Sequence, residues 1–259
     1  MTMLSLSLEG KVALVTGGSK GIGRAIAIAF AEQGADVAIA ARGKPALEKT
    51  VKEIEKRGRK ALAVPTDVGV TEQLNALHAQ TASTLGEVDI LVNNAAIFGI
   101  ESIVDVTQER FDEMMHINLW GALRLSQLCY PAMQKRGSGV ILNVASNAGL
   151  IGDPGIGIYP PSKAAMINLS LVMAKEWGKE GIRVVSIAPG LVRTELAAEL
   201  VEMLAKDPEM AKKLNPIGRV GEPEDIAGLA VLLAGEGGRF CTATTVVFDG
   251  GEMSQGVLD

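Results

Sequence analysis

Cysteines and aromatic side chains are scarce in this chain of 259 residues. It has two cysteines, Cys129 and Cys241, and aromatic residues make up 3% of the sequence. Because no Cys-x-x-Cys or Cys/His spacing occurs, we expect neither a disulfide framework nor a metal site. Apolar residues still make up 47% of the chain, so the core must consist mainly of Ala, Val, Ile and Leu. This composition is typical of a parallel sheet covered by helices.

Long apolar runs and an excess of positive charge are also lacking. No stretch approaches the roughly 18 apolar residues of a membrane span, and residues 1–9 lack the basic region and apolar run of a signal peptide. A formal net charge of −5 argues against a surface that attracts nucleic acid or anionic lipid. We therefore expect a cytoplasmic protein that binds small molecules or other proteins, with no nucleic acid and no membrane as partner.

Short apolar runs alternate with helical patterns along the chain. The runs predict strands at residues 11–16, 36–41, 60–64, 89–92, 139–145, 182–188 and 244–248. Helices are expected at residues 24–31, 46–57, 71–85, 110–136, 164–178, 195–206 and from residue 222 onward. No linker-like tract interrupts this order, which predicts one doubly wound α/β domain over residues 1–259, with a seven-stranded parallel sheet. Residues 191–216 show no strand pattern, and the amphipathic helix within them is expected to form a substrate lid.

A glycine-rich turn joins the first predicted strand to the first predicted helix. It contains Gly17, Gly21 and Gly23 in the spacing Gly-x-x-x-Gly-x-Gly. The N-terminus of a helix offers unpaired N–H groups and the positive end of a dipole, so this turn suits a phosphate. Glycines also serve ordinary turns, and the strand–turn–helix context is what favours a nucleotide site.

The end of the second predicted strand bears on the choice of nucleotide. In a dinucleotide fold, an Asp or Glu at this place accepts a hydrogen bond from the ribose 2′-hydroxyl of NAD. Here Ala41 and Arg42 stand there, and Lys20 in the glycine turn could approach the same group. A guanidinium binds a phosphate but cannot accept from a hydroxyl, which predicts NADP(H) in preference to NAD(H). The alternative is that both cations are solvated surface residues.

Tyr159 and Lys163 stand four residues apart and would share one face of a helix. A lysine beside a phenol favours the phenolate, so it would lower the pKa of the tyrosine and make it usable as a general acid or base. Ser146 is expected at the end of the fifth strand, near this pair. The same spacing also arises by chance. Pro160 and Pro161 prevent a helix from extending upstream, so we predict that the helix starts at one of them with Tyr159 at its cap.

Asn118 lies inside the helix predicted over residues 110–136, three residues before Gly121. Both residue types weaken a helix interior, and Gly121 costs about 1 kcal/mol relative to alanine. The pair predicts a bend or a bound water near the sheet, with a tolerated imperfection as the alternative.

Taken in order, these motifs resemble those of the short-chain dehydrogenase/reductase family. They are Thr16-Gly17-x-x-x-Gly21-x-Gly23, Asp67, Asn93-Asn94-Ala95, Asn118, Ser146, Tyr159-x-x-x-Lys163 and Pro189-Gly190-x-x-x-Thr194, and they extend over residues 11–251. Ala96 departs from the family, which usually has glycine there. The resemblance implies a Rossmann-like fold and an oxidoreductase that transfers a hydride between NADP(H) and a small carbonyl or secondary alcohol. The nearest likeness is to reductases of carbonyl and 3-oxoacyl-thioester compounds.

The resemblance also implies a role for each member of a catalytic tetrad. Tyr159 would exchange a proton with the substrate oxygen, and Ser146 would orient and polarise that oxygen. Lys163 would lower the pKa of Tyr159 and bind the nicotinamide ribose, while Asn118 would hold a water that links Lys163 to solvent. The implied cofactor-binding residues are Gly17, Gly18, Ser19, Lys20, Ile22, Arg42, Asp67, Val68, Asn94, Ala95, Ala96, Tyr159, Lys163, Pro189, Gly190, Val192 and Thr194. Since family members are commonly tetramers, we expect a homotetramer.

The motifs leave the substrate open. We expect a mostly apolar pocket with one acid, formed by Ile97, Phe98, Gly152, Asp153, Leu191 and the lid. Two other functions stay possible at this point. One is a non-catalytic NADP(H)-binding sensor or scaffold, and the other is a lyase-type activity on the same fold.

Overall fold

A seven-stranded parallel sheet forms the centre of the protein in a computed structural model that describes residues 5–206 and 214–257. The strand order is β3-β2-β1-β4-β5-β6-β7. The strands are β1 Val12–Thr16, β2 Asp36–Ala41, β3 Ala61–Pro65, β4 Ile90–Asn93, β5 Gly139–Val144, β6 Ile182–Pro189 and β7 Thr244–Phe248. All seven predicted strands are therefore confirmed, with bounds that differ by one residue at most. The order reverses between β1 and β4, which is where a doubly wound sheet opens a crevice at its carboxyl edge.

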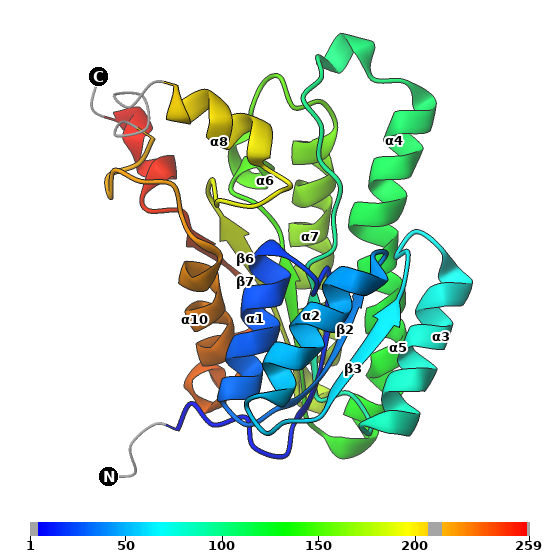
Figure 1. Ribbon diagram of the computed structural model, residues 1–259. Coiled ribbons are helices and arrows are strands. Elements are labelled where there is room, and N and C mark those ends of the chain that lie inside the picture. Colours follow the sequence, from blue (N-terminus) through cyan, green and yellow to red (C-terminus); the bar gives the residue numbers. More distant parts are fainter. Residues whose placement is uncertain (1–4, 207–213, 258–259) are drawn as a thin grey trace.

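Helices cover both faces of the sheet (Figure 1). One face carries α1 Gly21–Glu32, α2 Lys44–Glu55 and α10 Pro223–Ala234, and the other carries α3 Thr71–Thr84, α5 Gly121–Arg136 and α7 Tyr159–Trp177. Each face has its own cluster of buried aliphatic side chains, so the central strands are apolar on both sides. All five residues of β1 are buried, as expected of a strand enclosed between two helical layers.

Shorter helices complete the chain. They are α4 Gln108–Met115, α6 Ala148–Ile151, α8 Ala198–Ala205 and the 3₁₀ segments Ile103–Asp105, Gly178–Glu180, Glu236–Gly238 and Glu252–Val257. In Figure 1, α4, α6 and α8 lie beyond the carboxyl ends of the strands. The predicted lid helix over 195–206 is confirmed in its central part as α8, and residues 207–213 of the predicted lid fall outside the described residues. None of the described helices has both the length and the apolar character needed to cross a bilayer.

The start of α7 differs by one residue from the prediction. Ile158 is the N-cap and Tyr159 is the first helical residue, so the helix begins before Pro160 and not at it. The first turn closes through a hydrogen bond from the Ser162 N–H to the Ile158 carbonyl oxygen, of length 3.1 Å. The N–H groups of a first helical turn have no partner within the helix, so Pro160 and Pro161 cost no hydrogen bond there.

Candidate active site

Two cavities meet at the carboxyl edge of the sheet. The first is a groove of about 520 Å³ that follows the ends of β1, β2 and β4, and the second is a pocket of about 330 Å³ beside the ends of β5 and β6. The two are continuous because they share the lining residues Ile22, Asn94, Ala96, Thr194 and Leu196. The strand order thus brings the predicted nucleotide and catalytic motifs into one connected space.

The groove contains most of the residues predicted to bind the cofactor. Its lining includes Gly17, Ser19, Lys20, Ile22, Arg42, Asp67, Val68, Asn94, Ala95, Ala96 and Thr194. Pro189, Gly190, Val192, Tyr159 and Lys163 line the adjoining pocket. Gly18 lines neither cavity, because it packs against Ile39 and its N–H donates to the Ala40 carbonyl oxygen over 3.2 Å. Gly18 is therefore a buried residue within the turn.

The glycine turn is shaped by close contact with Asn94. Gly17 has a φ of +66°, and a Cβ there or at Gly23 would collide with the Asn94 side chain. Lys20 is the N-cap of α1, and its side chain makes no capping hydrogen bond to the helix. The first N–H groups of α1 therefore have no side-chain cap and stand beside the groove, where an anion would satisfy them.

The two predicted amides at the end of β4 point in different directions. Asn94 lines the groove, and its Nδ2 donates to the Thr16 carbonyl oxygen at 2.9 Å. Asn93 is buried and its Nδ2 donates at 2.8 Å to Oδ1 of Asn143, which in turn donates to Ser170. Successive side chains of a strand face opposite sides of the sheet, so only one of the two can reach a ligand.

Arg42 and Lys20 both line the groove, but they differ in their ion pairing. Arg42 is exposed, and no carboxylate among the described residues lies within 4 Å of it. Lys20 instead forms an ion pair with Glu195, across the groove. Asp67 lines the groove while its Oδ1 accepts a hydrogen bond of 2.9 Å from the Gly69 N–H. Arg42 is thus the cation with its guanidinium available for a phosphate.

Tyr159 is buried at the pocket wall, with 9% of its surface exposed. Its ring packs edge-on against Phe98, with centroids 5.0 Å apart, and the Nζ of Lys163 lies 5.6 Å from its centroid. Lys163 Nζ also donates to the Val144 carbonyl oxygen at 2.9 Å. Ser146, from the loop after β5, lines the same pocket. The structure therefore brings the three predicted catalytic side chains together.

The predicted lowering of the pKa of Tyr159 by Lys163 is wrong for this structure. Burial raises the pKa of Tyr159 to about 12, against a smaller lowering by a hydrogen bond with Ser146. Burial also lowers the pKa of Lys163 to about 8, because the ammonium has lost its solvation. The ammonium faces the Val144 carbonyl and the tyrosine ring, so it stabilises the phenolate less than a cation at the hydroxyl would.

Asn118 lies in a π-helical turn, His116–Trp120, that separates α4 from α5. Its Oδ1 accepts from the Ile97 N–H at 2.8 Å, and its Nδ2 donates to the Ile97 carbonyl oxygen at 3.0 Å. The residue after this turn is Gly121, and a glycine is needed there because a Cβ would collide with the Val68 backbone. The single helix predicted over 110–136 is thus interrupted at the predicted bend. Both polar atoms of the Asn118 side chain form hydrogen bonds with the Ile97 backbone. The water through which Asn118 would link Lys163 to solvent stays a prediction.

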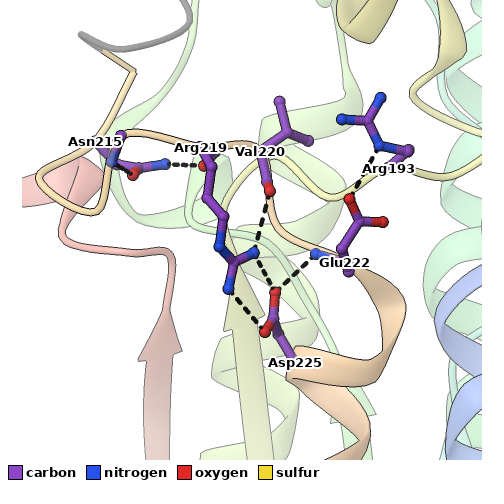
Figure 2. Close-up of polar contacts among 7 residues, drawn as sticks. Arg193, Asn215, Arg219, Val220, Glu222 and Asp225 are labelled. Atoms are coloured by element: carbon purple, nitrogen blue, oxygen red, sulfur yellow. Dashed lines mark hydrogen bonds and ion pairs between the residues drawn. The ribbon is translucent and has the colours of Figure 1, made fainter.

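The segment after β6 is braced from α10 (Figure 2). Arg219 forms two hydrogen bonds with Asp225, of 2.6 and 2.9 Å, and the Glu222 N–H donates to the same carboxylate at 2.8 Å. The Arg193 N–H donates to the Gly221 carbonyl oxygen at 2.8 Å. This places Val192, on the wall of the pocket, against a fixed backbone.

The substrate pocket differs in part from its prediction. Phe98, Asp153 and Leu191 line it as expected, whereas Ile97 lines the groove and Gly152 lines neither cavity. Asn147 and Glu252 were missed by the sequence reasoning, and Glu252 adds a second carboxylate. Apolar side chains from the predicted lid also contribute, namely Leu196, Leu200, Met203, Leu204 and Leu214. Among residues 5–206 and 214–257, no cluster of three or more His, Cys, Asp or Glu side chains is placed to hold a metal.

Comparisons with known proteins identify the family of this chain. A family model described as enoyl-(acyl carrier protein) reductase matches residues 17–252. The 3-oxoacyl-[acyl-carrier-protein] reductase FabG of Thermotoga maritima is 35% identical over 246 residues, covering 95% of this chain and 99% of the relative. Dehydrogenase/reductase SDR family member 4 of Sus scrofa is 37% identical over 251 residues, covering 96% and 89%.

A solved structure gives the same result for the fold. L-sorbose reductase from Gluconobacter frateurii, complexed with NADPH and L-sorbose, superposes with a TM-score of 0.92 at 32% identity, covering 97% of this chain and 100% of that one. Family model, relatives and fold thus agree over nearly the whole length. The chain belongs to the short-chain dehydrogenase/reductase family and is an oxidoreductase of that family.

Proposed function

We propose that this protein is an NADP(H)-dependent oxidoreductase that interconverts a small carbonyl compound and a secondary alcohol, with Tyr159 as general acid or base. The observation that carries the proposal is the position of Tyr159, Ser146 and Lys163, on a pocket that opens directly into the nucleotide groove. A substrate oxygen held by the two hydroxyl groups would keep its carbon at the junction of the two cavities.

The groove suits a nicotinamide dinucleotide. The glycine turn leaves room that a Cβ would fill, and the uncapped start of α1 favours a phosphate. Arg42 lines the groove and would bind a 2′-phosphate, and this is supported by two similar solved structures, the sorbose reductase and a putative gluconate 5-dehydrogenase from Beutenbergia cavernae, which contain NADPH and NADP. When bound, this cofactor supplies or accepts a hydride at its nicotinamide ring.

The protein's own residues handle the proton. With a pKa of about 12, Tyr159 carries its proton at neutral pH and can donate it to a carbonyl oxygen. Ser146 would polarise the same oxygen through its hydroxyl. Lys163, with a pKa of about 8, is buried beside the ring, where a positive charge stabilises the phenolate that forms after the transfer. Val192, braced through Arg193, would fix the nicotinamide end of the groove.

The role of Tyr159 is tested by substituting it with phenylalanine. Tyr159→Phe removes the hydroxyl and keeps the ring that packs on Phe98, so kcat for ketone reduction with NADPH should fall about 100-fold or more. Tyr130→Phe is the matched control, because Tyr130 is the other tyrosine of the chain and packs on Trp177, away from the pocket. Undiminished turnover by Tyr159→Phe would remove Tyr159 from the mechanism.

Cofactor choice is tested at Arg42. Arg42→Ala should weaken NADPH binding about 10-fold or more and leave NADH binding nearly unchanged, because a charge-assisted contact with the 2′-phosphate is lost. Lys44→Ala is the control, since Lys44 follows in the same segment but does not line the groove. Dissociation constants from calorimetry decide the question, and an equal effect on both nucleotides would contradict the assignment.

The alternatives make different predictions in the same assays. A nucleotide sensor or scaffold would bind NADPH tightly and show no turnover across a broad panel of ketones. A lyase-type enzyme would convert its substrate without net oxidation of the cofactor. The buried Tyr159 and Lys163 argue against a pure sensor, which has no need of ionisable groups that cost desolvation free energy.

We also propose that the protein is a homo-oligomer. β7 is an edge strand of the sheet, and Val247, Phe248 and the nearby Phe240 expose 39%, 43% and 101% of their surface. A second copy that covered this edge would bury apolar area and protect the outer edge of β7, which pairs with β6 on its other side. Sedimentation of the wild type and of Val247→Lys tests this, because the added charge should shift the mass toward smaller species.

A further inference from the structure

Asn147 and Glu252 lie together on the wall of the pocket next to the catalytic serine. Asn147 is 4% exposed and follows Ser146, whose Oγ lies 3.4 Å from the Asn147 Oδ1. Glu252 approaches from the 3₁₀ segment after β7, where its Oε2 accepts from the Leu191 N–H at 3.3 Å. Two segments that are distant in sequence thus place an amide and a carboxylate side by side.

The amide of Asn147 has an unused donor. Its Nδ2 makes no hydrogen bond of ordinary geometry among the described residues. Burial raises the pKa of Glu252, and its contacts with the Leu191 N–H and the Asn147 side chain offset part of that rise. The neighbouring carboxylate explains why the amide presents Nδ2 to this side and Oδ1 to the serine. A buried donor without a partner destabilises a protein by about 1–3 kcal/mol, so this arrangement is costly unless a ligand uses it.

A hydroxyl group matches this pair better than other groups do. A hydroxyl both donates and accepts, so it can donate to the Glu252 carboxylate while it accepts from the Asn147 Nδ2. A bare carbonyl or ether oxygen can accept only, and it would leave the carboxylate without a donor. A carboxylate or phosphate on the ligand would meet the charges of Glu252 and Asp153, which both line this pocket.

The place of the hydroxyl in the substrate follows from the distance to Ser146. The Nδ2 atom is bonded to the same carbon as Oδ1, which is 3.4 Å from the Ser146 Oγ. A ligand with two oxygens on neighbouring carbons can therefore reach both residues through hydrogen bonds of about 3 Å. One oxygen is the reacting carbonyl at Ser146, and the other is a hydroxyl between Asn147 and Glu252.

We propose that Asn147 and Glu252 form a binding site for a hydroxyl group next to the reacting carbonyl, so that the substrates are uncharged hydroxyketones and the corresponding diols. The remainder of the substrate is apolar, because Leu200, Met203 and Leu204 also line this pocket. This inference rests on the proposed oxidoreductase function. The hydroxyl site adds to that function a class of substrate and two residues that determine specificity. Proton transfer by Tyr159 and Lys163 does not by itself select a substrate.

Three ketones with the same alkyl chain test the site. They are a hydroxymethyl ketone, the matching methoxymethyl ketone and the matching ethyl ketone, and kcat/KM is measured for each with NADPH. The methoxy compound activates the carbonyl much as the hydroxy compound does, but it has no proton to give to Glu252. The wild type should prefer the hydroxymethyl ketone to the methoxymethyl ketone by about 10-fold or more.

Variants assign that preference to the two residues. Glu252→Gln keeps an acceptor for the Leu191 N–H and loses the charge, so the hydroxy-to-methoxy preference should fall about 5-fold. Asn147→Ala should slow both oxygenated ketones relative to the ethyl ketone. Asp153→Asn is the charge-matched control, which removes a carboxylate of the same pocket and should leave the hydroxy-to-methoxy ratio unchanged. Equal losses of this ratio in Asp153→Asn and Glu252→Gln would contradict a specific site.

Failure of the inference and failure of the proposed function give different results. Turnover of all three ketones with no hydroxyl preference in the wild type would overturn the hydroxyl site and leave the oxidoreductase proposal intact. Absence of turnover for all three would count against the proposed function. Calorimetric affinities would then decide the site, since equal binding of the hydroxymethyl and methoxymethyl ketones to the NADP-loaded wild type would overturn it as well.

Discussion

Replacing Lys163 by methionine should change how the stability of the protein depends on pH. Lys163 is 2% exposed, and its Nζ donates a hydrogen bond to the Val144 carbonyl oxygen. Burial lowers the pKa of this lysine from 10.5 to about 8. The folded protein therefore disfavours the charged form of the Lys163 side chain relative to its neutral form. Methionine fills a similar volume and carries no charge.

The sign and size of the effect follow from the two pKa values. Below about pH 8 the lysine is protonated in both states, and the folded state bears the full cost of burying the charge. Between about pH 8 and 10.5 the unfolded chain binds more protons than the folded one, so the lysine's contribution to stability rises with pH. A lowering from 10.5 to about 8 corresponds to about 3 kcal/mol over this range.

Urea unfolding of the wild type and Lys163→Met at a series of pH values measures this contribution. Lys163→Met should gain most relative to the wild type near neutral pH, and the free-energy difference between the two should shift by up to about 3 kcal/mol in favour of the wild type toward pH 10.5. Groups common to both proteins cancel in the difference, including the other lysines. Parallel stability curves across this range would refute the argument that Lys163 is desolvated.

Three further outcomes are expected. Because the pKa of Tyr159 is about 12, kcat/KM for alcohol oxidation should rise about tenfold per pH unit through neutrality while ketone reduction stays flat, and an oxidation plateau below pH 9 would contradict this. Gly23→Ala should weaken NADPH binding about 10-fold or more in calorimetry, since its Cβ would meet Asn94, whereas Gly228→Ala in α10 meets no neighbouring atom and should leave binding unchanged. Asp225→Ala should lower the free energy of unfolding by about 1–2 kcal/mol through loss of a helix cap and an exposed ion pair. The pKa of Asp225 is lowered to about 2 by Arg219, so this difference should be present above pH 3.8 and disappear on acidification through about pH 2, as followed by urea unfolding.

The sequence alone determined the layers of the fold and most of the nucleotide groove. Buried parallel strands are continuous apolar runs, and the glycine turn occurs between a strand and a helix, so local pattern was sufficient for both. The one-residue error at Tyr159 has a local cause, because prolines are tolerated in a first helical turn as well as before it.

Only the tertiary structure decided which side chains face the ligand and what charge they carry. Asn93 and Asn94 are neighbours in sequence, yet the alternation of a strand sends one into the core and the other to the groove. The pKa values of Tyr159 and Lys163 depend on burial by β5, α7 and the loops, which no spacing of residues specifies. Glu252 reaches Asn147 because β6 and β7 are neighbours in the sheet, so the candidate hydroxyl site arises from strand order and carries no local sequence signal.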